Sequence, residues 1–260
     1  MTTSNHQPMK RNNTPGIIKF GKAPAKRDNR NLKLSAVLRA PIPLPAEYDF
    51  DVTHNGIPTP MFGNDQYGDC VIAGRAHQTL RFETAKEGVL ISITDKDVLR
   101  EYLKETGGGD TGLVVLDSLK LWRKRGWRAA KQRFKIKAFA EIDRTSHQEV
   151  KRAVYLDVGV GLGFTLPDSA ITQFHAGKPW EVISGPGSRP NPHNGHYVYV
   201  PGYTKGGPVC VTWGRKQQMT WAFLKKYSDE AYAIIDAVDT AKKKRNLDEK
   251  KINQFLTSVK

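Results

Sequence analysis

The stretch that decides the fold reads NDQYGDCVIAG and covers residues 64–74. Its first half is rich in the turn-forming residues Asn, Asp and Gly, and from Val71 to Lys86 apolar residues recur at helical spacing. This pattern predicts a turn that runs straight into a buried helix, with Cys70 at the amino end of that helix. Because the amino terminus of a helix lowers the pKa of a thiol, Cys70 is a candidate nucleophile.

A thiol nucleophile needs a base, and His196 is the candidate. It lies 126 residues after Cys70, at the start of the alternating run 196–202, which predicts a strand. His77 lies on the same predicted helix as Cys70 but roughly 10 Å along its axis, too far for a hydrogen bond. His193 is a loop neighbour of the preferred base. We therefore expect a Cys70–His196 pair supplied by two distant parts of the chain.

The remaining patterns predict an α+β fold. Thr94 has the pattern of a helix cap before residues 98–106, and Asp110 or Thr111 is expected to cap a further helix that ends near Arg125. Period-two alternation or continuous apolar character predicts strands at residues 134–139, 158–164, 196–202, 208–213 and 230–235, and helical spacing predicts helices at 145–156 and 220–227. A helical amino-terminal half should thus pack against a mainly antiparallel β carboxyl-terminal half.

The expected domain organisation has three parts. Residues 1–45 contain several prolines and no helical periodicity, which predicts an extended basic arm draped over the body. Residues 46–236 form the expected compact domain. Residues 237–260 form a lysine-rich helix or tail.

The two ends carry most of the net charge of +15. Residues 1–40 hold nine Lys and Arg against one Asp, and residues 242–260 hold seven against one Asp and one Glu. Such ends are typical either of solvated tails or of arms that bind a nucleic acid or an acidic assembly partner.

Composition excludes several classes of protein. No apolar run approaches the roughly 20 residues that span a bilayer, and the polar amino terminus predicts no secretory leader. Two cysteines are too few for a disulfide framework, so we expect the cytoplasm or the interior of a host cell, with a virus particle as the alternative. The run GVGLG at 159–163 has the wrong spacing for a dinucleotide site, and the histidines lack zinc-ligand spacing. No cofactor and no metal are expected.

Three blocks resemble the papain-like cysteine peptidases. That family has a Gln before a Gly-Ser-Cys-Trp run at the head of a long helix, then a His-Ala-Val-x-x-x-Gly-Tyr strand, then an Asn-Ser-Trp-Gly turn. The corresponding stretches here are residues 64–70, HYVYVPGY at 196–203 and VTWG at 211–214. The resemblance covers roughly residues 45–236 and implies a papain-like fold with Cys70 as nucleophile and His196 as base.

The departures from the family pattern concern the supporting residues. Thr212 stands where the family has the Asn that orients the histidine. Asn64 stands where the family has its oxyanion-hole Gln, and Gln66 lies two places further on. Either amide is a candidate to join the Cys70 backbone N–H in holding an oxyanion. Val71 replaces the family's Trp, and Asp69 precedes the cysteine.

Two functions follow as hypotheses. The first is a thiol hydrolase that cleaves a peptide or related amide bond, with a peptide or protein as substrate. The second is a weakly active or inactive structural or binding protein on the same fold, such as a virion component attached through its basic arms. The Gly-Asp-Cys run also resembles cell-wall endopeptidases of the NlpC/P60 type, but those place their histidine about fifty residues after the cysteine.

Overall fold

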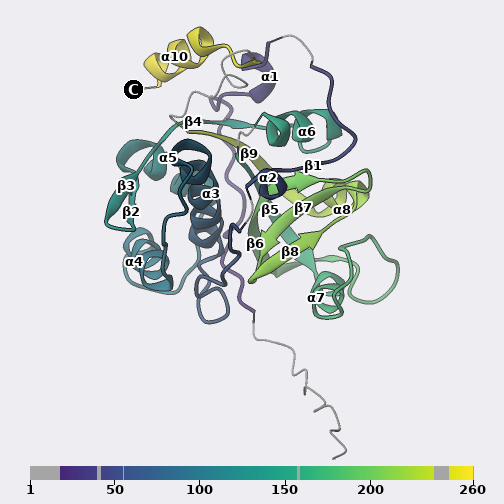
Figure 1. Cartoon of the computed structure of the whole chain (residues 1–260). Helices are drawn as coiled ribbons and strands as arrows, with labels where there is room; N and C mark the ends of the chain where they lie inside the picture. Colours follow the sequence, from purple (N-terminus) through teal and green to yellow (C-terminus); the bar gives the residue numbers. More distant parts are fainter. Residues whose placement is uncertain (1–17, 40–41, 55, 157–158, 237–245, 260) are drawn as a thin grey trace, which may run out of the picture.

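The computed structural model describes residues 18–39, 42–54, 56–156, 159–236 and 246–259. A group of helices lies on one side and an antiparallel sheet on the other, with helix α3 along the seam between them (Figure 1). The expected α+β architecture, helical in its amino-terminal half and antiparallel in its carboxyl-terminal half, is confirmed.

The main sheet has seven strands in the order β4-β9-β5-β6-β7-β8, and β1 pairs with β6 outside this path. Every pairing in it is antiparallel. The strands are β1 (Tyr48–Asp49), β4 (Ile136–Glu141), β5 (Gly159–Pro167), β6 (Pro190–Tyr203), β7 (Pro208–Thr212), β8 (Arg215–Gln218) and β9 (Ser228–Asp236).

The helical part contains α3 (Cys70–Glu87), α4 (Asp95–Thr106) and α5 (Val115–Arg125), with the small hairpin β2 (Trp127–Ala129) and β3 (Gln132–Phe134) beside them. The predicted cap of α4 is present as a full capping box, in which Thr94 and Asp97 bond each other's backbone N–H groups. The other helices within the described ranges are α1 (Leu34–Val37), α2 (Phe50–Thr53), α6 (His147–Tyr155), α7 (Asp168–His175), α8 (Trp221–Tyr227) and α10 (Glu249–Ser258).

The central strands divide their side chains between two cores. Along β9, Ala231, Ala233 and Ile235 join the core that also holds α6 and α8 residues, whereas Tyr232 and Ile234 join the core around α3, α4 and α5. This alternation is the period of two expected for a strand with both faces covered. The sheet is therefore the shared wall between the two cores.

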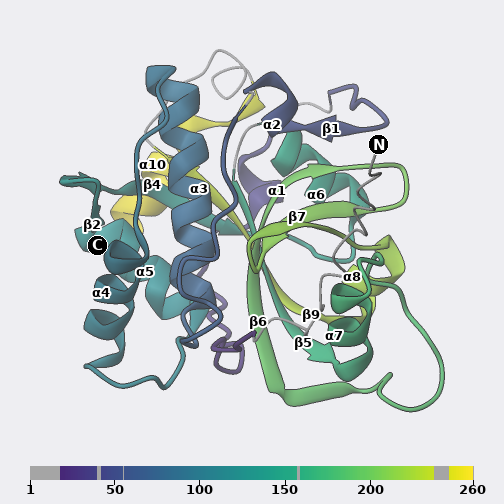
Figure 2. The same cartoon turned by 60° about the horizontal axis from the view of Figure 1, so that its bottom comes forward.

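Glycines let α3 approach the sheet closely. A Cβ atom at Gly74 would lie 2.7 Å from the ring of Tyr197 on β6, and one at Gly161 would lie 1.8 Å from the Tyr197 hydroxyl. The glycines of the GVGLG run leave room for neighbouring side chains: Gly159 for Gln78 of α3, Gly161 for Tyr197 of β6, and Gly163 for Lys22 and Glu230. Figure 2 shows α3 lying next to β6 as a result.

The expected cap of α5 is wrong. The helix begins at Val115, and Val114 precedes it without a side-chain cap. The Asp110 carboxylate instead accepts hydrogen bonds from the Gly68 backbone N–H at 2.9 Å and from the Tyr102 hydroxyl at 2.6 Å. Asp110 therefore fixes the turn before Cys70, a contact between segments far apart in the sequence.

The amino-terminal arm differs from the expectation of an extended segment outside the core. Leu34 and Val37 of α1 are fully buried in the larger core, and Leu247 and Ile252 near the carboxyl terminus join them. The compact unit therefore extends beyond the expected boundaries of 46–236 at both ends. Residues 1–17 and 237–245, which hold part of the predicted basic arms, lie outside the described residues.

Several cations of the arm contact acidic groups of the body. Lys26 Nζ lies 3.1 Å from the Asp117 carboxylate, and Lys33 pairs with Glu141. These charges are thus partly neutralised within the chain, which weakens the expectation that this part of the arm binds a polyanion. Among the described residues, no helix has the length and apolar character needed to cross a membrane.

The burial of α1 predicts that the arm contributes to stability. Leu34→Ala should lower the free energy of unfolding by about 2–5 kcal/mol, because it leaves a cavity in the core. Val52→Ala is the control, since Val52 is 70% exposed and its truncation should change stability by less than about 0.5 kcal/mol. Urea unfolding measures both, and equal effects of the two substitutions would show that α1 is not part of the folded unit.

Candidate active site

Cys70 is the first residue of α3, as its sequence position predicts. It is 1% exposed, and backbone N–H groups of Tyr197 and Gly21 face its sulfur. Tyr197 follows His196 on β6, so the thiol lies directly beside the strand that carries the predicted base. The structure therefore brings the two candidate residues to one seam, between α3 and β6.

His196 is held by two residues at the end of β7. Its Nε2 atom lies 2.6 Å from Thr212 Oγ1, and its ring stacks on Trp213 with the centroids 4.0 Å apart. The Nδ1 atom is buried and has no hydrogen-bond partner among the described residues. Trp213 has a positive φ of 42°, in the turn that leads into β8. One ring nitrogen is thus anchored, and the other is left for a reacting group.

A segment of the arm covers this pair. We call residues 19–23 the covering segment; it runs along the seam between α3 and the sheet (Figure 1). Its backbone bonds to the helical part through Asn64 and Leu113, with N–H to O distances of 2.8–2.9 Å, and to the sheet through the Gly195 carbonyl, at 3.0–3.1 Å. Phe20 packs edge-on against the rings of both His196 and Trp213.

The fit of the covering segment around Gly21 is very tight. A Cβ atom on Gly21 would lie 1.6 Å from the Gly68 carbonyl oxygen, and a Cβ on Gly195 would lie 2.0 Å from the Lys22 carbonyl oxygen. Only glycine fits at both positions. The covering segment can approach the backbones of Gly68 and Gly195 this closely because Gly21 and Gly195 have no side chains.

The covering segment does not present the Gly21 carbonyl to the thiol. The Gly21 N–H donates to the Gly195 carbonyl at 3.1 Å and lies near the Cys70 sulfur, whereas the Gly21 carbonyl accepts a hydrogen bond of 2.8 Å from the Leu113 N–H. Lys22 and Leu113 form a parallel bridge. Attack by sulfur requires the carbonyl carbon, so the Gly21–Lys22 peptide bond is not positioned for cleavage.

Burial suppresses the charge of both candidate residues in this arrangement. It raises the pKa of the Cys70 thiol to about 12 and lowers the pKa of His196 to about 3, the latter with a smaller contribution from the nearby Lys22 ammonium. At neutral pH the covered pair therefore consists of a thiol and a neutral imidazole. A reactive thiolate requires that the covering segment leave.

The two oxyanion candidates lie in different environments. Asn64 is buried, and its Nδ2 atom donates to the Tyr67 carbonyl at 3.1 Å and lies 3.5 Å from the Lys19 carbonyl of the covering segment. The side chain of Gln66 is exposed. The geometry favours Asn64 over Gln66. Burial also raises the pKa of Asp69 to about 8, so this neighbour of the thiol is largely neutral at pH 7.

Three further residues, His193, Cys210 and His77, are not part of the Cys70–His196 pair. His193 is exposed, whereas Cys210 is a free, fully buried thiol in the larger core, and His77 is buried against Phe62. Within the described residues, no group of three His, Cys, Asp or Glu side chains is arranged to hold a metal ion.

Solved structures with the same architecture are cysteine proteases. Xylellain, a cysteine protease from Xylella fastidiosa, superposes with a TM-score of 0.65 at 14% identity, over 89% of this chain and 100% of xylellain. The papain-like fold is thereby established. The cysteine protease CMS1MS2 of Carica candamarcensis matches with a TM-score of 0.55 at 13% identity, over 74% of this chain and 99% of its own. Procathepsin B S9 from Trypanosoma congolense matches with a TM-score of 0.58 at 12% identity, over 85% and 87% of the two chains.

Comparison at the level of sequence finds no relative. No protein-family profile matches the chain, and no curated protein matches it. At 11–14% identity the structural likeness shows the papain-like fold alone, so the activity depends on the residues of this chain.

Sequence reasoning missed three features of the site. Trp213 lies in the VTWG stretch at 211–214, but that pattern does not predict its stacking on His196. Gly21 and Lys22 were counted only as part of a basic arm. Their signal in the sequence is weak: a Gly-Lys pair after the stretch IIKF at 17–20, in a segment without periodicity.

Proposed function

We propose that this protein is a thiol hydrolase that cleaves a peptide or related amide bond, and that the covering segment holds it in an inactive form. The observation that carries the proposal is the extended backbone of residues 19–23, bonded on both sides of the seam beside Cys70. A cleft that binds one extended backbone through N–H and C=O groups offers the same groups to a substrate chain.

Each residue has a role that follows from its chemistry. The Cys70 sulfur attacks the carbonyl carbon of the substrate, and His196 Nδ1 takes the thiol proton and later gives it to the leaving amine. Thr212 Oγ1, 2.6 Å from Nε2, accepts a hydrogen bond from the Nε2–H and fixes the ring, with Trp213 packed on its face. The attack produces a thioester and releases the amine, and water then hydrolyses the thioester.

The oxyanion formed in the attack needs hydrogen-bond donors. The Cys70 backbone N–H and the Asn64 side-chain amide are the proposed donors. The Asn64 Nδ2 atom now lies beside the Lys19 carbonyl of the covering segment. When that segment leaves, this donor becomes free for the carbonyl of a substrate.

The test uses the Gly21→Ala variant, because a methyl group at this position collides with the Gly68 backbone and should expel the covering segment. We expect this variant to cut an unstructured protein such as casein into fragments detected by mass spectrometry. The double variant Gly21→Ala/Cys70→Ala should release none.

Two outcomes would contradict the proposed function. If the Gly21→Ala variant binds peptides without cutting them, the chain is a binding protein on a papain-like fold, as in the second hypothesis. If the double variant cuts as well, the cleavage comes from elsewhere and Cys70 is not the nucleophile.

A further inference from the structure

The Lys22 side chain fills an acidic pocket next to the Cys70–His196 pair. It is 1% exposed, and its Nζ lies 3.0 Å from Asp229 Oδ2 and 3.4 Å from Glu230 Oε1. Nζ also donates to the Ala23 carbonyl at 3.1 Å, and Thr165 Oγ1 supports the Asp229 carboxylate at 2.9 Å. A buried ammonium is costly unless it is paired, so this pocket is chemically matched to a cation.

The pocket also has space for a long, unbranched side chain. A Cβ atom at Gly163 on β5 would lie 2.5 Å from Lys22 Cε and 2.5 Å from Glu230 Cγ. The absence of a side chain at this position therefore leaves the space that the lysine stem occupies. Burial raises the pKa of Glu230 to about 7 even though the Lys22 ammonium opposes this shift.

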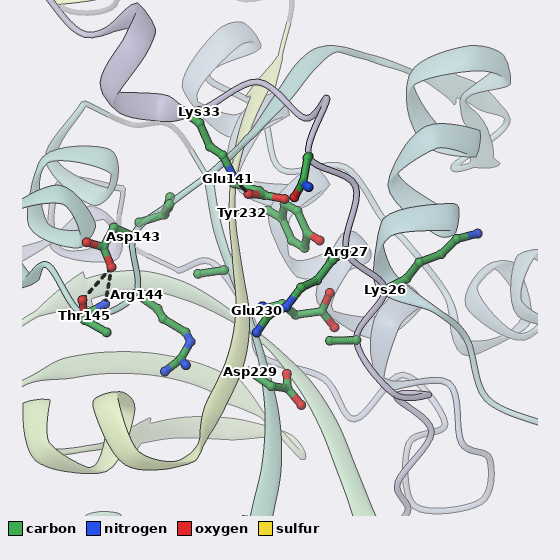
Figure 3. Close-up of a pocket in the computed structure, with 14 residues that line it drawn as sticks. Lys26, Arg27, Lys33, Glu141, Asp143, Arg144, Thr145, Asp229, Glu230 and Tyr232 are labelled. Carbon is green, nitrogen blue, oxygen red and sulfur yellow. Dashed lines mark hydrogen bonds and ion pairs between the residues drawn. The ribbon is translucent and has the colours of Figure 1, made fainter.

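On the side away from Lys22, Asp229 and Glu230 border a second cavity. Asp229 and Glu230 also line a cavity of about 320 Å³ beneath the passing amino-terminal chain. Figure 3 shows both side chains projecting from β9 toward that chain, near Arg27 and Tyr232. Asp229 and Glu230 both belong to β9, so the sheet, and not the covering segment, fixes the positions of their backbones.

The pocket has a fixed relation to the reacting sulfur. The Gly21 backbone, bonded to the Gly195 carbonyl, lies near the Cys70 sulfur, and Lys22 is its neighbour in the chain. A substrate that replaces the covering segment along the same groove therefore places a side chain in the pocket within one or two residues of the bond that is cut.

We propose that the pocket formed by Gly163, Asp229 and Glu230 selects substrates with a Lys or Arg side chain within one or two residues of the scissile bond, and that Lys22 imitates this side chain in the covered form. This inference rests on the proposed thiol hydrolase. Asp229 and Glu230 are specificity residues in this account, because they contact the substrate side chain and take no part in bond cleavage.

The test measures cleavage in the full-length Gly21→Ala chain. A pool of unstructured peptides is digested, the cut sites are mapped by mass spectrometry, and kcat/KM is then compared for one Lys peptide and its matched Gln peptide. We expect cut sites flanked by Lys or Arg and a preference of at least fivefold for the Lys peptide. Glu230→Gln should lower that ratio at least threefold, and Gly163→Ala should lower it by filling the pocket. Glu47→Gln is the control, since it removes an exposed carboxylate whose contact is the Lys205 backbone N–H.

The possible failures are distinguishable. Cleavage without a preference for Lys or Arg, or a ratio unchanged by both pocket variants, overturns this inference and leaves the proposed function standing. Absence of any cleavage by the Gly21→Ala chain overturns the proposed function, and the inference falls with it. Urea unfolding of each variant establishes that the compared chains are folded.

Discussion

Gly21→Ala should raise the rate at which iodoacetamide alkylates Cys70 by about a hundredfold or more at pH 7. In the covered form, burial raises the pKa of the thiol to about 12, so almost none is thiolate. A thiol with an ordinary pKa of about 8.5 is about 3% thiolate at pH 7, on the order of a thousand times more. Part of this gain is lost because the native chain also reacts through transient opening of the covering segment.

The chain contains its own controls for this experiment. Cys210 is fully buried in the core and should stay unlabelled in the variant, which separates opening of the cleft from unfolding. Gly206→Ala is the matched substitution, because its Cβ would meet its nearest neighbour at 3.4 Å, an ordinary contact. An unchanged rate at Cys70, or equal labelling of Cys210, would show that the covering segment does not control access to the thiol.

The parts of the fold that local sequence determines were predictable. The turn from Asn64 to Cys70 and the capping box at Thr94 are short-range patterns, and both appear where the sequence places them. The alternation in β6 and β9 likewise follows from residues that face two cores in turn. These predictions succeeded because the causes lie within a few residues of one another.

The features that were missed depend on contacts between distant segments. Asp110 looked like a helix cap, but its carboxylate bonds Gly68 and Tyr102 instead. Helix α1 is a four-residue helix, too short to show periodicity, so the burial of Leu34 could not be read from the pattern. A basic, proline-containing arm favours the expectation of an exposed tail, and only the structure reveals that Lys22 meets Asp229 and Glu230.

The candidate site was predictable in its residue types. The positions of Cys70 and His196 were proposed from the helix start, the strand pattern and the resemblance, and the structure places both at the seam between α3 and β6. Their catalytic roles stay predictions. What sequence could not reveal is that the backbone of residues 19–23 lies between them and any substrate, because backbone hydrogen bonds carry no residue-type signal.

The second prediction with a large expected effect concerns His196, the proposed base, and the pKa of the Cys70 thiol. Once the covering segment is removed by Gly21→Ala, desolvation no longer holds His196 neutral, and its imidazolium can stabilise the Cys70 thiolate. A depressed thiol pKa keeps the thiolate present as the pH falls below 8, until the pH reaches that lowered pKa. Replacing His196 by Ala in this variant removes the imidazolium that stabilises the thiolate, and the pKa of the Cys70 thiol should return to about 8.5. Only about 0.3% of such a thiol is ionised at pH 6, although its thiolate is intrinsically more nucleophilic.

The most direct test of the central claim is therefore the rate of Cys70 alkylation between pH 5 and pH 9 in two chains, Gly21→Ala and Gly21→Ala/His196→Ala. We predict that the first reacts at pH 6 at least tenfold faster than the second, with its titration midpoint well below 8. Identical profiles with a midpoint near 8.5 in both chains would show that the sulfur and the imidazole do not share a proton, and would contradict the proposed active site.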